Sequence, residues 1–305
     1  MARNPEKLRS LLTSQAHGVS ESIMSRSLRI VQGDVKDAHA VRRTLVMESG
    51  RAAEAEGGGS SNTKATFSSS SSPSSSSFSP SNPASASSTS TADIIIFGVG
   101  GAPRLTPFSV HLVTVDDPHV CGEGMKTVLE VLESIRAASL RRDAGAGAAT
   151  VPTFKKPFVA AISTTGLPLT GGSGRGGRRD VPLPLLPLYR WLLAVPHQDK
   201  LEMERALLLL LSSSASSSDG GGLVDAVVVR PTLLVDGERS GREKVRVGWE
   251  RVGGGGGDGG RVGPGPAVGY SVRRADVGEW LYEEVVMGRT NDAREWAGRV
   301  VTLSN

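Results

Sequence analysis

The side chains best suited to chemistry lie close together in segment 196–200, which reads Pro-His-Gln-Asp-Lys. A histidine whose pKa is near neutrality can donate a proton, so His197 is a candidate general acid. Lys200 follows three residues later and is a candidate catalytic cation. A plainer interpretation stays open for both: His197 could be a solvated loop residue, and Lys200 could form a surface pair with Glu204, which contributes only a few tenths of a kcal/mol.

Hydroxyl groups follow a run of apolar residues over 158–162, where the chain continues as Ser163-Thr164-Thr165-Gly166. The apolar run is typical of a buried strand. Ser163 or Thr164, at the end of that strand, could therefore supply a hydroxyl to a reacting carbonyl group.

Glycines follow another predicted strand, which covers 92–98. The ligand crevice of an open parallel sheet lies at the carboxyl ends of its strands. Gly98, Gly100 and Gly101 would let the backbone approach a ligand there, because glycine has no Cβ atom. A plain turn is the alternative interpretation.

The elements that must position these residues alternate along the chain. Near-continuous apolar runs separated by amphipathic helices indicate a parallel sheet with helices on both faces. The sequence therefore predicts a Rossmann-like α/β fold. The predicted strands cover 28–31, 92–98, 158–162, 226–229 and 299–303, and the predicted helices cover 37–47, 124–138, 198–211 and 277–287, with a short helix beginning near Pro5.

We expect one domain over 1–305, interrupted by segments that cannot build a core. The segment 50–91 is rich in Ser, Gly, Ala and Pro, and Phe67 and Phe78 are its only large apolar residues. It cannot offset an ordering entropy of roughly 1–2 kcal/mol per residue, so we predict a disordered insertion. The segments 212–222 and 253–265 are predicted to be flexible loops.

Composition limits the partners. The net charge of +4 suits an anionic ligand. The arginines are scattered, however, so we predict no nucleic-acid partner. The one cysteine, Cys121, excludes an internal disulfide, and we assign it no role. No apolar run reaches the ~18–20 residues of a membrane helix, so we predict no membrane partner and take the cytoplasm as the default location. We predict no metal site.

Short motifs occur in a fixed order along the chain: 3–8 (Arg-Asn-Pro-Glu-Lys-Leu), 31–35 (Val-Gln-Gly-Asp-Val), 97–100 (Phe-Gly-Val-Gly), 162–166 (Ile-Ser-Thr-Thr-Gly), Asp199-Lys200 with Met203-Glu204, and 229–232 (Val-Arg-Pro-Thr). In this order they resemble the atypical short-chain dehydrogenase/reductases of the NAD(P)H-binding, NmrA-like group, among them a set of fungal proteins. The resemblance implies a dinucleotide cofactor, NADP(H) or possibly NAD(H), and a small-molecule substrate.

The resemblance also implies residue roles. Arg3 would lie beside the adenosine ribose and favour the 2′-phosphate of NADP, because a guanidinium pairs with phosphate. Asp34 would accept a hydrogen bond from the adenine amino group. Gly98, Gly100 and Gly101 would approach the cofactor ribose, and Lys200 would lie near the nicotinamide ribose. Arg3 as a solvated helix-start residue and Asp34 as a turn or cap residue remain open.

Two departures from the family pattern affect the expected activity. The usual Tyr and the Lys four residues after it are missing, since Leu193 stands four residues after Tyr189. A Gly-rich strand–turn–helix is also missing, and we expect about 30–35 residues of it upstream of Met1. If the chain is complete as written, strand 28–31 must pair with strand 92–98 or stay unpaired, and no dinucleotide is bound tightly.

These observations predict an NAD(P)H-binding protein that carries out NADP-dependent reduction of a small carbonyl-type substrate. Two alternatives remain. One is a non-catalytic dinucleotide-sensing or interaction protein, which the missing Tyr-x-x-x-Lys pattern favours. The other is a non-functional fragment from a truncated gene model.

Overall fold

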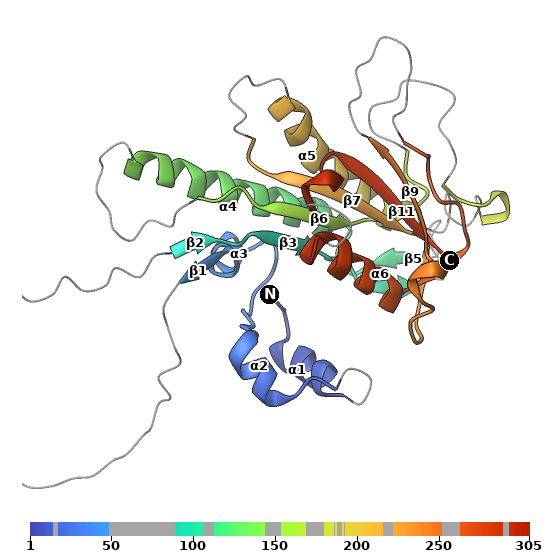
Figure 1. Ribbon diagram of the computed structural model, residues 1–305, viewed down its shortest axis with the longest axis horizontal. Helices are drawn as coiled ribbons and strands as arrows, with labels where there is room; N and C mark the ends of the chain where they lie inside the picture. The colour runs from blue at the N-terminus through green and yellow to red at the C-terminus, as the bar shows by residue number, and fades with distance from the viewer. Residues whose placement is uncertain are drawn as a thin grey trace, which may run out of the picture.

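The computed structural model describes residues 1–14, 18–48, 89–105, 113–143, 154–168, 180–185, 187, 191, 193–215, 222–251, 263–288 and 293–305. Its centre is a five-stranded sheet in the order β3-β6-β7-β11-β9 (Figure 1). The first four strands are parallel to one another, and β9 is antiparallel to β11. The strands are β3 (Ile94–Phe97), β6 (Phe158–Ile162), β7 (Asp225–Pro231), β9 (Arg246–Arg251) and β11 (Arg299–Ser304).

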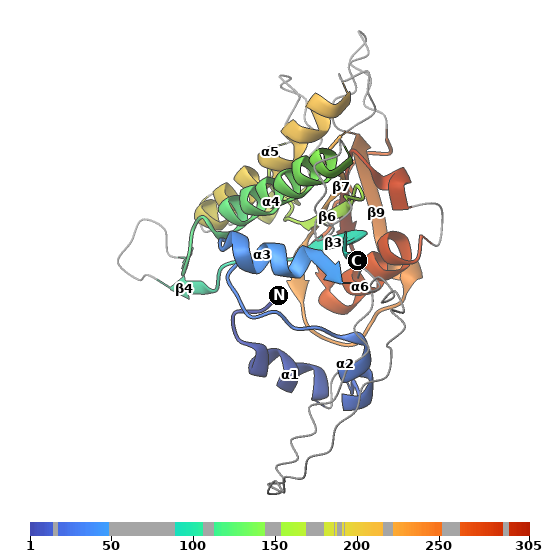
Figure 2. The same cartoon turned by 90° about the vertical axis from the view of Figure 1, so that its left-hand side faces the viewer.

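Helices cover both faces of this sheet. The helices α3 (Ala38–Leu45), α4 (Val120–Asp143) and α5 (Ala194–Ala215) lie on one face (Figures 1 and 2). Their apolar side chains bury Val159, Ala161 and other strand residues in one core. The helix α6 (Arg274–Trp280) and its π-helical continuation η4 (Leu281–Val286) form a second core on the opposite face. The predicted Rossmann-like, mostly parallel architecture is confirmed.

The strand β3 differs from its prediction. The apolar run over 92–98 predicts a strand buried on both faces, but within the described residues β3 pairs only with β6 and lies at the edge of the sheet. Ile96 is 46% exposed as a result. An apolar run in the sequence indicates that a strand is apolar, but it does not indicate whether one or two strands pair with it.

The predicted strand over 28–31 is wrong. In the structure these residues are extended but form no strand, and Gln32 makes a single parallel bridge to Ala2. The segment therefore pairs with the start of the chain instead of β3. The nearby turn is tight, since a Cβ atom on Gly33 would lie 2.3 Å from the Cβ atom of Ala40. Only glycine fits there.

Two helices precede this turn. The predicted short helix near Pro5 is α1 (Pro5–Thr13), and the Asn4 side chain caps it by accepting a hydrogen bond from the Lys7 N–H group. A second helix, α2 (Glu21–Ser27), was not predicted. Both lie apart from the sheet in Figures 1 and 2.

The helix α5 is longer than its prediction. It extends through Ala215, into the segment 212–222 that was predicted to be a loop. Leucine is a strong helix former, and Leu207 and Leu208 are buried against the α4 side of the sheet, so packing carries the helix past the start of the serine run. Residues 216–221 lie outside the described residues.

Short elements complete the chain and were not predicted, because few of them have an apolar run of their own. They are β1 (Val46–Glu48), β2 (Thr89–Thr91), β4 (Pro103–Leu105), β5 (Val113–Val115), β8 (Leu233–Val235), β10 (Ser271–Arg273), η1 (Leu183–Leu185), η3 (Arg242–Lys244) and η5 (Ala293–Trp296).

Thr89–Thr91, at the end of the predicted 50–91 insertion, pair with β1, whereas 50–88 lie outside the described residues. Gly265, in the predicted 253–265 loop, bridges to Trp249, and 253–262 are likewise outside. Within the described residues, no helix combines the length and apolarity needed to cross a bilayer.

Candidate functional site

Lys200 lies at the carboxyl ends of two adjacent strands. Its ammonium group donates hydrogen bonds to the backbone oxygens of Val99 (2.7 Å) and Ile162 (2.8 Å), which follow β3 and end β6. The side chain is therefore fixed at the sheet edge and does not form a surface pair with Glu204. An ammonium has three N–H donors, and within the described chain Lys200 uses two of them for these contacts. The Cys121 thiol, which donates to the same Val99 oxygen, lies next to this ammonium.

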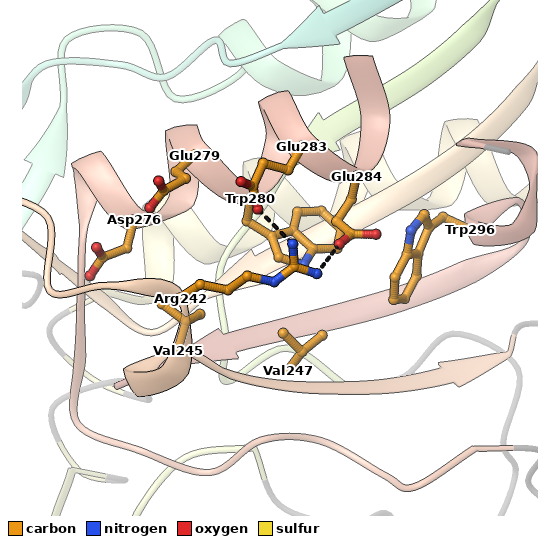
Figure 3. A pocket seen from close by; sticks show the side chains of 9 residues that line it. All are labelled: Arg242, Val245, Val247, Asp276, Glu279, Trp280, Glu283, Glu284 and Trp296. Carbon is orange, nitrogen blue, oxygen red and sulfur yellow. Dashed lines mark hydrogen bonds and ion pairs between the residues drawn. The ribbon is translucent and has the colours of Figure 1, made fainter. Parts of the chain in front are cut away.

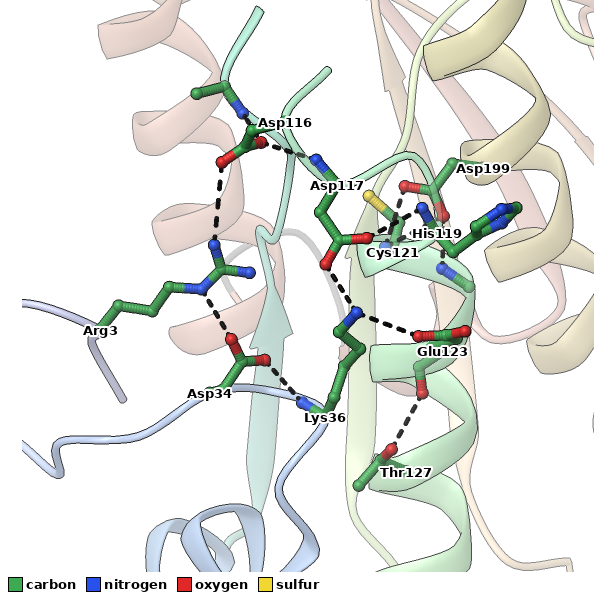
Figure 4. Close-up of polar contacts among 12 residues, drawn as sticks. Arg3, Asp34, Lys36, Asp116, Asp117, His119, Cys121, Glu123, Thr127 and Asp199 are labelled. Atoms are coloured by element: carbon green, nitrogen blue, oxygen red, sulfur yellow. Dashed lines mark hydrogen bonds and ion pairs between the residues drawn. The ribbon is translucent and has the colours of Figure 1, made fainter. Parts of the chain in front are cut away.

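The neighbouring Asp199 holds α5 against α4. Its carboxylate accepts hydrogen bonds from the backbone N–H groups of Cys121 (3.0 Å) and Gly122 (2.8 Å), in the first turn of α4 (Figure 4). These are unpaired donors at a helix start, where a negative charge also complements the helix dipole. Asp199 thus fills a helix N-terminus that could otherwise bind an anion, and it fixes the backbone beside Lys200.

Of the predicted hydroxyls, Ser163 faces the same side as Lys200. The Ser163 and Thr165 N–H groups continue the pairing with β7, donating to the oxygens of Val229 (2.7 Å) and Pro231 (3.3 Å). Because side chains alternate along a strand, Ser163, the first residue after β6, lies on the face of Ala161, which packs under α4 and α5. Thr164 and Thr165 lie in the loop that follows.

Two of these hydroxyl groups lack partners in the described part of the chain. Ser163 and Thr165 are 5% and 0% exposed, and among the described residues neither hydroxyl oxygen has a hydrogen-bond partner. A buried polar group without a partner is unfavourable, which points to a polar group of a ligand near Ser163. The sequence analysis did not single out Thr165, because it is the third hydroxyl residue in a row and nothing in the sequence distinguishes it from the two before it.

The glycines after β3 behave differently from one another. Gly98 and Gly100 are exposed, and a Cβ atom on Gly100 would have nothing within 4 Å. Gly101 packs tightly, since its Cβ would lie 2.8 Å from the Cβ atom of Val115. Gly100 therefore borders open space, whereas Gly101 is needed for close packing against the end of β5.

Arg3 and Asp34 are brought together. The Arg3 Nε atom lies 2.9 Å from Asp34 Oδ2, and both side chains are partly exposed (Figure 4). Asp34 also accepts a hydrogen bond from the Lys36 N–H group at 3.0 Å. This contact is the one expected of Asp34 as a turn residue. Arg3 lies 4.0 Å from Asp116, beside Gly101. Both residues assigned to the adenosine half of a dinucleotide therefore lie next to the glycine segment.

Lys36 links this cluster to α4. Its ammonium contacts Asp117 (2.7 Å) and Glu123 (3.1 Å), and these hydrogen bonds raise the pKa of Lys36. The contact with Lys36 lowers the pKa of Asp117. Glu123 is in the same turn of α4 whose N–H groups Asp199 caps. One turn of α4 thus joins the Arg3–Asp34 cluster to the Lys200 side of the site.

His197 is neutral at pH 7. Burial lowers its pKa from 6.5 to about 4, and the positive charge of Arg230 adds to the effect. The near-neutral pKa expected from the sequence is wrong, and so is the solvated-loop alternative, because His197 is half-buried in the first turn of α5. A neutral imidazole with this pKa is a poor general acid at physiological pH.

This lowered pKa makes stability depend on pH. Between pH 6.5 and 4 the unfolded chain binds a proton at His197 that the folded chain does not, so the free energy of unfolding falls as the pH is lowered. We expect wild type to lose about 2 kcal/mol more than His197→Asn between pH 7 and pH 5. Urea unfolding at the two pH values measures this difference, with exposed His39→Asn as control. Equal losses in wild type and His197→Asn would contradict it.

Cys121 is a buried thiol without nucleophilic character. Burial raises its pKa to about 12, and its Sγ donates to the Val99 oxygen at 3.2 Å. The thiol is protonated at physiological pH, in keeping with the absence of an assigned role. Tyr189, the remaining aromatic candidate for proton transfer, lies outside the described residues. The position four residues before Lys200 is Pro196, which has no hydroxyl.

Arg230, at the end of β7, was missed as a site residue. It is 1% exposed and pairs with the fully buried Glu204 of α5 through Nε (2.9 Å) and Nη2 (2.5 Å). The sequence did hold a signal for this buried ion pair, namely an arginine at the end of an apolar strand, because a buried arginine requires a carboxylate partner. The sequence could not show which carboxylate it was.

A separate pocket of about 260 Å³ lies between the α6–η4 helix and β9 (Figure 3). The Arg242 guanidinium spans it and contacts Glu283 (2.7 Å) and Glu284 (2.6 Å). Trp280 and Trp296 line it with ring centroids 5.2 Å apart. None of the sequence-predicted residues lines this pocket, which lies at the opposite edge of the sheet from β3.

The described residues fit the two ends of a dinucleotide. At one end a buried hydroxyl without a partner among the described residues (Ser163), a fixed ammonium (Lys200) and an open glycine (Gly100) could hold a ribose and a nicotinamide. At the other end Arg3 and Asp34 offer a guanidinium and a carboxylate. The fit to a dinucleotide therefore depends on the polar groups present at both ends.

No protein-family model matches the chain. Two curated fungal proteins are similar to it over its whole length. Reductase pytE of Aspergillus terreus is 32% identical over 308 residues, which cover 100% of this chain and 87% of that protein. Oxidase pynE of Aspergillus niger is 30% identical over 315 residues, which cover 100% and 88%.

Similar solved structures are more distant. A short-chain dehydrogenase/reductase from Veillonella parvula in complex with NADP has a TM-score of 0.45 at 10% identity, covering 98% of this chain and 88% of that one. The anaerobilin reductase ChuY from Escherichia coli O157:H7 has a TM-score of 0.41 at 14% identity, covering 93% and 78%.

The sequence relatives are a named reductase and a named oxidase, and both cover the whole of this chain. The chain belongs to the family that includes Reductase pytE and Oxidase pynE.

Proposed function

We propose that the chain is an oxidoreductase that uses a nicotinamide dinucleotide, NADP(H) in preference to NAD(H), on a small carbonyl-type substrate. The observation that carries this proposal is Lys200, whose ammonium is fixed to the backbone oxygens at the ends of β3 and β6. The buried hydroxyl of Ser163, which follows Ile162 directly and has no partner among the described residues, supports the same proposal. The relatives named a reductase and an oxidase support redox chemistry.

When bound, the reduced dinucleotide supplies a hydride. Lys200 would hold the ribose of the bound dinucleotide, and Ser163 would donate a hydrogen bond to the substrate oxygen. Because His197 is neutral and Pro196 has no hydroxyl, Lys200 would be the proton source among these residues, relayed through the Ser163 hydroxyl. Hydride on carbon and a proton on oxygen convert the carbonyl to an alcohol.

The test is turnover. The protein is incubated with NADPH and a panel of aldehydes and ketones, and NADPH consumption is followed by absorbance. We expect consumption with at least one carbonyl that Ser163→Ala slows by at least about 10-fold, as general acid–base contributions of 10²–10⁴ allow. Consumption that is insensitive to Ser163→Ala would contradict the assigned role.

The cofactor preference depends on Arg3. Its guanidinium is half exposed and paired only with partly exposed carboxylates, so a 2′-phosphate can replace them. We expect Arg3→Glu to reduce the preference for NADPH over NADH by about 10-fold or more, because it removes a charge-assisted contact and adds repulsion. Kd values for both dinucleotides measure this. The exposed Arg9→Glu is the control, and an unchanged ratio in Arg3→Glu would remove Arg3 from the site.

A second function, non-catalytic dinucleotide sensing, is favoured by Pro196, which stands where a Tyr-x-x-x-Lys pattern would place its phenol. A sensor needs the binding contacts and no proton donor. Saturable NADPH binding without turnover on any carbonyl would support the sensor over the enzyme.

A further inference from the structure

Arg230 lies at the junction of three elements that surround the proposed site. It ends β7, it pairs with Glu204 on α5, and its Nη1 and Nη2 atoms donate to the backbone oxygens of Leu167 (3.1 Å) and Pro168 (3.3 Å). Leu167 and Pro168 follow Ser163 by four and five residues in the segment after β6. One guanidinium therefore joins the hydroxyl-bearing segment to the lysine-bearing helix.

A second carboxylate extends this connection. Asp180 lies 3.8 Å from Arg230, and its Oδ2 atom accepts a hydrogen bond from the Gly166 N–H group at 3.1 Å. Burial raises the pKa of Asp180, and the nearby Arg230 opposes that rise. The segment 163–168 is thus held at three backbone positions, Gly166, Leu167 and Pro168, by groups that depend on Arg230.

The partner on α5 is placed so that it fixes the lysine. Glu204 follows Lys200 by four residues, so the two side chains share one face of the helix. His197 precedes Lys200 by three residues, on the same face. Fixing Glu204 to Arg230 therefore fixes the helix face that carries Lys200 relative to Ser163.

Stability alone does not require this arrangement. Replacing a buried ion pair with apolar residues of similar volume is often neutral or stabilising, because both charges lose their hydration. The guanidinium fork, however, can hold a carboxylate and two carbonyl oxygens in one plane, which no apolar side chain does.

We propose that Arg230 is a positioning residue that fixes Ser163 relative to Lys200 through Glu204, Leu167 and Pro168. It touches neither dinucleotide nor substrate and acts through the segment 163–168. The effect on turnover rests on the proposed function, whereas the effect on the segment does not.

The test is the double variant R230M/E204M, which removes both charges together. Its readouts are the thermal midpoint, the NADPH Kd, kcat with a carbonyl substrate, and hydrogen exchange of the Gly166 amide. We expect a folded protein with an NADPH Kd within about twofold of wild type. The Gly166 amide should exchange at least about tenfold faster, and kcat should fall at least about tenfold, because a misplaced hydroxyl loses its near-attack geometry.

The matched control is R239M/E279M, which removes an ion pair of 2.5 Å outside this network and should leave exchange at Gly166 and kcat unchanged. If R230M/E204M does not fold, R230K gives the same readouts, since its ammonium keeps the charge but not the fork. Wild-type exchange at Gly166, or faster exchange with wild-type kcat, would overturn the proposal. If wild type binds no dinucleotide, the proposed function fails, and exchange at Gly166 alone decides whether Arg230 positions the segment.

Discussion

Glu204→Ala is expected to destabilise the fold by about 3–5 kcal/mol, because it leaves the Arg230 guanidinium charged and buried without its carboxylate. Arg230 and Glu204 are 1% and 0% exposed, so water cannot replace the lost partner. Burial opposes the charge on Arg230, yet Glu204 outweighs it, and the pKa of Arg230 is raised. The guanidinium therefore stays charged, and the penalty falls on the folded state.

Urea unfolding followed by tryptophan fluorescence measures this loss. The control is Glu279→Ala, which removes the partner of the exposed Arg239 and should change the free energy of unfolding by about 1 kcal/mol or less. Similar losses in the free energy of unfolding for Glu204→Ala and Glu279→Ala would contradict this expectation, because the buried pair would then contribute no more than a surface pair.

Lys200→Met is expected to lower kcat by at least about 100-fold, because it removes both the proton source and the donor to the ribose. The substitution keeps the apolar stem and removes the ammonium, so the packing of α5 is retained. The backbone oxygens of Val99 and Ile162 lose a charge-assisted hydrogen bond each, which lowers stability as well.

Comparison at a temperature well below the unfolding transition separates the two effects. Lys126→Met, on the exposed face of α4, is the control and should keep wild-type kcat. Lys200→Arg tests whether charge alone suffices, and we expect it to remain impaired because the guanidinium cannot reproduce the tetrahedral contacts. Wild-type turnover in folded Lys200→Met would remove this residue from the mechanism.

The sequence predicted the elements that have a strong period. The spacing of Met125, Leu129 and Leu132 located α4, and the apolar run 158–162 located β6 with the observed bounds. Elements that are stabilised by pairing were missed: β9 (Arg-Val-Gly-Trp-Glu-Arg) has no apolar run, and it pairs with β11 along its whole length. The strand prediction for 28–31 was wrong because an apolar run becomes a strand only where a neighbouring strand pairs with it.

The site was predicted in part. Ser163 could be placed because it follows a predicted strand at the carboxyl edge of a parallel sheet, whereas the position of Lys200 came from the family resemblance. The neutral state of His197 could not be predicted, because its lowered pKa arises from burial and from Arg230, which lies 33 residues away along the chain. The pairing of Arg3 with Asp34 likewise depends on a chain path that no local pattern records.

Calorimetric titration of NADPH into wild type, Lys200→Met and Lys126→Met tests whether the carboxyl ends of β3 and β6 bind a nicotinamide dinucleotide through Lys200. We expect saturable one-to-one binding to wild type and Lys126→Met, and binding at least about 10-fold weaker to Lys200→Met, as loss of a charge-assisted hydrogen bond implies. The same Kd for Lys200→Met as for wild type, or no saturable binding to wild type, would contradict this expectation.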